Sequence, residues 1–207
     1  MSVDSADHAP LDARQIIRIE SLHRGFLYQH LFGVACLLSA HELGLTKVIV
    51  ERDEDVELVR VGSRLYAQVK SRLTPLTWSD IEGAMERFAA IRGEHEIGAR
   101  AGEASFAIIS NSAPGPELSA RLFAAEWPSD VRVLWPGQTD ASLPSPEPDI
   151  PSLLAKCAEL AARLPFAMLS PETLVWKLAG AVAAASAGSM SRADHAFRTE
   201  ELAALFE

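Results

Sequence analysis

The sequence is poor in cysteine and lacks long hydrophobic runs. Its two cysteines, Cys36 and Cys157, lie far apart in apolar, helix-like surroundings. This favours reduced core residues in a cytosolic protein over a disulfide framework or a zinc site. The longest apolar run, residues 31–40, is too short to cross a bilayer. The first residues lack the basic region and apolar run of a signal peptide. We therefore expect a cytoplasmic protein with no membrane partner.

Positive charge is also scarce. The chain has 19 Lys and Arg against 28 Asp and Glu, a net charge of −9. A dedicated nucleic-acid binder usually has a basic surface, because neutralising phosphates supplies much of its affinity. An enzyme can instead use a local basic patch, bound divalent cations or partner domains. The charge therefore speaks against a uniformly basic binding surface but leaves a nuclease open.

Several sequence signatures of chemistry are missing. We find no P-loop, glycine-rich nucleotide motif, Ser-His-Asp pattern or zinc signature. The 207 residues, 48% hydrophobic and 23% charged, are instead typical of one soluble globular domain, with or without a helical appendage.

The hydrophobic pattern predicts alternating helices and strands. Helical spacing covers 24–43, 77–92, 117–125, 150–164, 171–187 and 199–206, and strand-like runs cover 46–51, 55–61, 64–70, 105–110 and 131–135. This order predicts an α/β fold with a mixed central sheet flanked by helices.

Proline content divides the predicted chain. Five prolines between Pro136 and Pro151 mark a loop that regular structure cannot cross. We expect a core over 1–135, of which 1–12 form a flexible leader. The loop covers 136–151. Residues 152–207 are expected to be a helical extension that packs on the core or leads to a further domain.

Four polar residues flank one predicted hairpin turn. If Gly62-Ser63 is a two-residue turn, Asp55 lies opposite Lys70 and Glu57 opposite Gln68, all on one face. A carboxylate with an amide oxygen suits Mg²⁺, and a nearby lysine can stabilise charge on a phosphate. The same pattern also fits a cross-strand ion pair on a solvated sheet face.

These residues resemble the PD-(D/E)XK, or restriction-endonuclease-like, nucleases. An acid, a hairpin and then (D/E/Q)-x-K matches Asp55 followed by Gln68-Val69-Lys70. RGFLYQ (24–29), VIVERDEDVEL (48–58) and YAQVKSR (66–72), followed by LTWSDI, are similar to the effector nuclease domain of prokaryotic antiphage proteins. Such domains occur in CBASS-type double-stranded-DNA endonucleases and in some STAND-type NTPase sensors. The resemblance covers about residues 20–110 and implies an α-β-β-β-α-β core.

The resemblance also implies residue roles. Asp55 and Gln68 would hold Mg²⁺ or Mn²⁺, with Gln68 standing where most relatives have an acid. Lys70 would be the catalytic lysine. Gln29 would face the site, unless it is a hydrogen-bonded core amide. Accessory carboxylates are Glu51 or Glu57, and the DNA-contact candidates are Arg24, Arg64 and Arg72.

The implied function is metal-dependent endonucleolytic cleavage of double-stranded DNA in prokaryotic antiviral defence. The implied partners are double-stranded DNA, a homo-oligomer that activates the enzyme, and a C-terminal sensor or NTPase domain or a separate regulator. Two alternatives remain at this point: a non-catalytic interaction module on the same fold, and an RNase or nickase.

Overall fold

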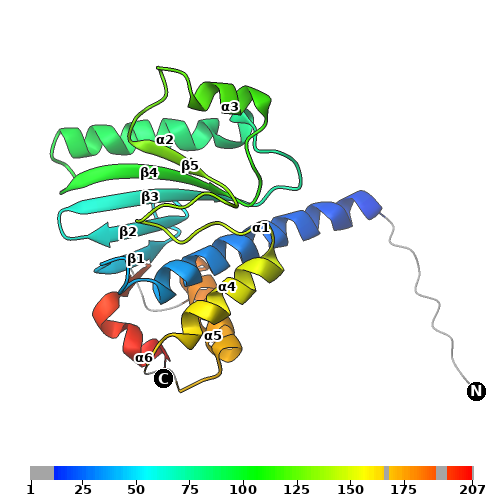
Figure 1. The fold of residues 1–207 in the computed structure, drawn as a ribbon, viewed down its shortest axis with the longest axis vertical. Coiled ribbons are helices and arrows are strands. Elements are labelled where there is room, and N and C mark those ends of the chain that lie inside the picture. Colours follow the sequence, from blue (N-terminus) through cyan, green and yellow to red (C-terminus); the bar gives the residue numbers. More distant parts are fainter. Residues whose placement is uncertain (1–11, 166–167, 190–194, 207) are drawn as a thin grey trace, which may run out of the picture.

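The computed structural model describes residues 12–165, 168–189 and 195–206, and the leader expected over residues 1–11 lies outside them. Figure 1 shows helices on both sides of a twisted sheet. The elements are α1 (Ala13–Leu38), β1 (Lys47–Val50), β2 (Val56–Arg60), β3 (Ser63–Lys70), α2 (Trp78–Glu96), β4 (Glu103–Ser110), α3 (Pro116–Leu122), β5 (Val131–Leu134), α4 (Ile150–Ala162), α5 (Pro171–Ser186), β6 (Ala196–Arg198), a 3₁₀ turn (Thr199–Glu201) and α6 (Leu202–Phe206).

The six strands form one mixed sheet in the order β5-β4-β3-β2-β1-β6. β1, β2 and β3 form an antiparallel meander. β4 and β5 then run parallel to β3, because α2 and α3 carry the chain back across the sheet. The predicted α/β class with a mixed sheet is confirmed.

Hydrophobic layers cover both faces of the sheet. Alternate strand residues point to opposite faces, so Val56, Leu58 and Ala67 join a core with α1, α4 and α5. Tyr66 and Phe106 point the other way and pack under α2 and α3. Within the described residues, none of the helices combines the length and apolar character needed to cross a bilayer.

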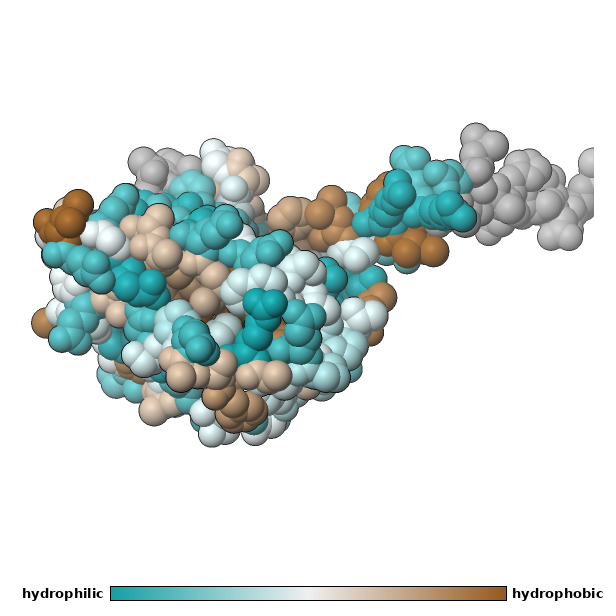
Figure 2. All heavy atoms as spheres, turned by 90° about the horizontal axis from the view of Figure 1, so that it is seen from above, coloured by the Kyte–Doolittle hydropathy of each residue, from teal (hydrophilic) through white to brown (hydrophobic). Residues whose placement is uncertain are grey.

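Helix α1 is longer at its start than the sequence predicts. Asp12 caps it by accepting hydrogen bonds from the backbone N–H groups of Arg14 (2.9 Å) and Gln15 (3.2 Å). The C-terminal half is buried in the core, whereas the N-terminal half projects beyond the sheet (Figures 1 and 2). Ile17 and Leu22 on this half are 62% and 58% exposed.

The C-terminal region packs on the core and adds a strand to it. Helix α4 packs against α1, with the Cys157 thiol donating to the Leu31 carbonyl at 3.5 Å. The prediction of helices alone after residue 152 misses β6, which pairs antiparallel with β1. A strand of three residues is too short to carry a period-2 pattern.

The β2–β3 hairpin has a different register from the predicted one. Arg60 pairs with Ser63, so the turn residues are Val61 and Gly62, and Gly62 has a φ of 77°. Glu57 therefore lies opposite Tyr66 and not opposite Gln68. A shift of two residues keeps every side chain on its predicted face but changes its cross-strand neighbour.

Candidate active site

The turn between β1 and β2 carries a run of acids at one end of the sheet. It closes through hydrogen bonds from the Glu51 N–H to the Asp55 carbonyl (3.1 Å) and from the Arg52 N–H to the Glu54 carbonyl (3.3 Å). Glu51 adopts a φ of 50°, in the left-handed region that a residue with a Cβ rarely occupies. Such strain costs about 1–3 kcal/mol and is found most often at functional sites.

Asp55 is fixed against the last residues of β3. Its Oδ2 accepts hydrogen bonds from the Val69 backbone N–H at 2.7 Å and from the Gln68 side-chain amide. Among the described residues, no hydrogen bond reaches Oδ1. Asp55 therefore presents one oxygen that is already held and one that can bind a ligand.

Gln68 is oriented by an arginine from α2. Its Oε1 accepts a hydrogen bond from Arg87, while its Nε2 donates to Asp55. The reverse orientation of the amide would set donor against donor and oxygen against carboxylate. Arg87 is held in turn by two hydrogen bonds to the buried Glu54, at 2.8 and 3.0 Å.

Glu51 is the second carboxylate beside Asp55. It accepts a hydrogen bond from the side-chain amide of Gln29 on α1. Burial, and then the charge of Asp55, raise the pKa of Glu51 to about 7. Burial also raises the pKa of Asp55, although the Val69 N–H and then the charge of Lys70 act in the opposite direction.

A groove of about 500 Å³ opens next to these carboxylates. It is bounded by the N-terminal half of α1 and by the residues at and after the end of β3. Both Gln29 and the half-buried Lys70 line it. We call Gln29, Glu51, Asp55, Gln68 and Lys70 the carboxylate site.

Glu57 does not join the carboxylate site, which corrects the prediction that four polar side chains converge. Glu57 has Tyr66 as its cross-strand partner, and the Glu57 side chain is fully buried there, away from Asp55 and Gln68. It accepts hydrogen bonds from the Asp53 N–H (3.1 Å) and from Arg64 (3.3 Å). Of the two accessory carboxylates expected, only Glu51 lies beside Asp55.

Glu57 belongs to a second polar group, which we call the arginine-paired cluster. Arg100 bonds Asp53 at 2.6 Å and the Tyr66 hydroxyl at 3.3 Å, and the Tyr66 hydroxyl lies 3.0 Å from His95 Nε2. The cluster consists of Asp53, Glu57, Arg64, Tyr66, His95 and Arg100.

The three predicted DNA-contact arginines have different surroundings. Arg72 lines the groove and also pairs with Asp80 at 2.7 Å. Arg64 is directed to Glu57, away from the carboxylate site. Arg24 is half-buried on α1 and is not among the residues that line the groove.

Sequence reasoning does not identify two residues of this region, Glu54 and Arg87. Glu54 is one of five acids in residues 51–57 (ERDEDVE), and Arg87 is one of many charged residues on an amphipathic helix. They are 33 positions apart and belong to different elements. A single sequence has no local signal for such a pairing.

The donor atoms present fit a small divalent cation only in part. Within the described residues, no group of three or more His, Cys, Asp or Glu is arranged to hold a metal. Glu51 and Asp55 nevertheless offer two hard carboxylates whose mutual repulsion a cation would relieve. The Gln68 oxygen is bonded to Arg87, which opposes the predicted role of Gln68 as a ligand.

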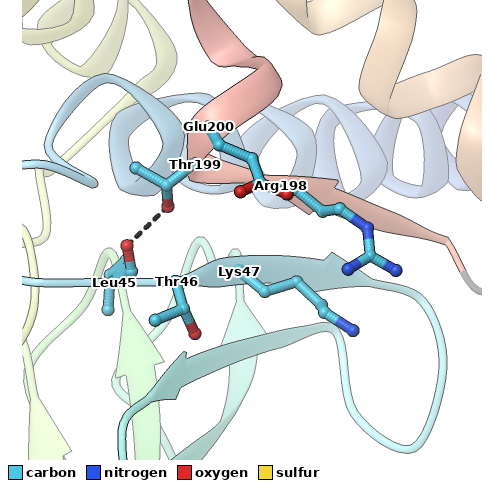
Figure 3. A pocket seen from close by; sticks show the side chains of 6 residues that line it. All are labelled: Leu45, Thr46, Lys47, Arg198, Thr199 and Glu200. Atoms are coloured by element: carbon cyan, nitrogen blue, oxygen red, sulfur yellow. Dashed lines mark hydrogen bonds between the residues drawn. The ribbon is translucent and has the colours of Figure 1, made fainter.

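A separate hollow lies at the β6 edge of the sheet, where β6 meets β1 (Figure 3). It is lined by Leu45, Thr46, Lys47, Arg198, Thr199 and Glu200. No candidate residue takes part in it, so it is distinct from the carboxylate site.

Comparison with known proteins gave no significant match, whether to protein-family models, to curated protein sequences or to solved structures.

Proposed function

We propose that this chain is a metal-dependent endodeoxyribonuclease of the restriction-endonuclease-like type. The observations that carry the proposal are that Glu51 lies beside Asp55, that the charge of Lys70 acts on Asp55, and that Lys70 lines an open groove. The element order α1-β1-β2-β3-α2-β4 agrees with the core expected from the resemblance of residues 20–110. Hydrolysis of double-stranded DNA in antiviral defence, with activation by oligomerisation, is the corresponding biological role.

The proposed ligands of Mg²⁺ or Mn²⁺ are Asp55 and Glu51. Gln68 then acts as the donor that holds the Asp55 carboxylate, and Gln29 as the donor that holds Glu51. When bound, the metal would polarise the phosphate and lower the pKa of an attacking water.

The residues of the chain supply positioning and charge for the reaction. Lys70 places a positive charge close to Asp55 and on the groove, where negative charge develops on the attacked phosphate. A water adds to phosphorus and gives up one proton to solvent in the open groove. The bond between phosphorus and the leaving oxygen breaks, and that oxygen takes up one proton from the same solvent, so the step balances as the addition of one water.

Plasmid cleavage with Mg²⁺ or Mn²⁺ at high protein concentration tests the proposal. We expect Asp55→Asn and Lys70→Ala each to reduce cleavage at least ~100-fold, because each removes transition-state stabilisation. Lys177→Ala, at an exposed lysine of α5, is the matched control and should cut like the wild type.

An inert wild-type protein, or Asp55 and Lys70 variants that cut equally well, would reject the nuclease assignment in favour of a non-catalytic module. Parallel assays on RNA and on nicked products distinguish an RNase or a nickase.

A further inference from the structure

One glycine of α1 has no structural reason to lack a side chain. A Cβ on Gly33 would touch Val50 and Val182 in the core, at 3.6 and 3.7 Å. A Cβ on Gly25 would meet nothing within 4 Å. Glycine inside a helix is less stable than alanine, because it loses more backbone entropy on folding. Packing within the chain therefore does not account for Gly25.

Gly25 lies on the wall of the groove next to the carboxylate site. The same wall carries Ser21 and Arg18, about one and two turns earlier on α1. Lys70 and Arg72 stand on the opposite wall. None of the lining residues is acidic, in a chain whose net charge is −9.

Contacts with the rest of the fold hold each wall of the groove at its end near the carboxylate site. Asn111 fixes the Arg72 backbone by accepting from its N–H (2.6 Å) and donating to its carbonyl (3.0 Å). On the α1 side, Tyr28 donates to the Glu147 carbonyl at 2.6 Å. Arg18 is exposed, and no ion pair reaches it from the part of the chain that the structure describes. It is therefore available to an anion from outside.

We propose that this groove takes the sugar-phosphate backbone of the strand that is cut. Gly25 marks the closest approach of that backbone to α1, where a side chain would fill the space. Arg18 and Arg72 contact phosphates on either side of the scissile one, which lies at Lys70. This assignment rests on the proposed nuclease function and adds the path of the substrate to it.

Fluorescence anisotropy with a labelled DNA duplex tests the groove, in buffer with Ca²⁺ replacing Mg²⁺. Gly25→Leu should weaken binding at least ~10-fold and melt no lower than the wild type, since its side chain points into open space and leucine favours a helix over glycine. Gly25→Ala should melt roughly 2–4 °C higher than the wild type. Gly180→Leu is the matched control, because Gly180 is an exposed glycine of α5 that also has nothing within 4 Å.

The salt dependence of binding provides a second readout. Arg18→Ala should reduce the slope of log K against log salt by about 0.9, the value for one phosphate contact. Arg163→Ala, at an exposed arginine after α4, should leave the slope unchanged.

The outcomes separate the groove from the nuclease function. If Gly25→Leu and Arg18→Ala both bind DNA as tightly as the wild type, the groove does not hold the DNA backbone. Lys70-dependent cleavage would still support the nuclease function in that case. Binding that both variants weaken, in a protein that does not cut, would support the groove and reject hydrolysis. A wild type that does not bind the duplex would overturn the groove.

Discussion

Two groups of buried or half-buried carboxylates lie close together in this protein, and they differ in how their charge is balanced. In the arginine-paired cluster, Asp53 bonds Arg100 and Glu57 bonds Arg64. In the carboxylate site, Glu51 and Asp55 receive hydrogen bonds from the neutral amides of Gln29 and Gln68. The charge of Lys70, which also lines the groove, acts more strongly on Asp55 than that of Arg87, which bonds Glu54 and Gln68.

The difference shows in which group each acid already has a positively charged partner. Arg100 lowers the pKa of Asp53, whereas burial and the charge of Asp55 raise the pKa of Glu51 to about 7. A site with excess negative charge beside an open groove is suited to a cation and substrate. A cluster in which each acid has an arginine is suited to holding the fold.

The largest effect expected from this comparison is on stability, at Arg64. Arg64→Ala would leave the fully buried Glu57 carboxylate without its cation. We expect a loss of about 3 kcal/mol in the free energy of unfolding, because an uncompensated buried charge is costly. Urea denaturation at pH 7 measures it.

The control for Arg64→Ala is Arg163→Ala, at an exposed position where a change below about 0.5 kcal/mol is expected. If both variants unfold at the same urea concentration, the arginine-paired cluster does not support the fold.

The next effect is at Glu51, where a substitution should lower the affinity for metal and raise the stability of the fold. Glu51→Gln removes one of the two proposed carboxylate ligands, so we expect Mn²⁺ affinity at pH 8 to fall about tenfold or more. It also removes the repulsion between Glu51 and Asp55. The variant should also unfold at a higher temperature than the wild type at that pH. Calorimetric titration and thermal melts measure the two quantities.

The pH dependence follows from the raised pKa of Glu51. The folded protein holds this proton more tightly than the unfolded chain, whose carboxyl has a pKa near 4.5. Stability contributed by the protonated form is therefore lost as pH rises from about 4.5 to 7. Metal affinity should rise over the upper part of this range, by up to ~10-fold per pH unit below 7. A flat wild-type profile, or a Glu51→Gln profile of the same shape, contradicts this role.

A smaller effect is expected at Arg87. Arg87→Lys keeps the positive charge near Glu54 but loses the planar fork that bonds Glu54 and Gln68 together. We expect a loss of about 1 kcal/mol in stability and a several-fold weaker affinity for Mn²⁺. Equal metal affinity in the wild type and Arg87→Lys would show that Arg87 does not position the site.

The sequence predicts most elements of the fold because their hydrophobic periods are long and regular. It does not predict the hairpin partners, since Val61-Gly62 and Gly62-Ser63 are both plausible turns and the choice moves Glu57 next to Tyr66. The hydrogen bonds between Gln29 and Glu51 and between Arg87 and Glu54 join separate elements. Such contacts depend on tertiary packing, which the local pattern does not contain.

The most direct test of the central claim is Mn²⁺ binding to the wild type and to Asp55→Asn at pH 8, measured by isothermal titration calorimetry. We expect a metal site in the wild-type protein that Asp55→Asn loses, with the variant's thermal melt showing that the fold is retained. A wild type that binds no Mn²⁺, or an Asp55→Asn variant that binds it equally well, would contradict the claim that this carboxylate site holds a metal.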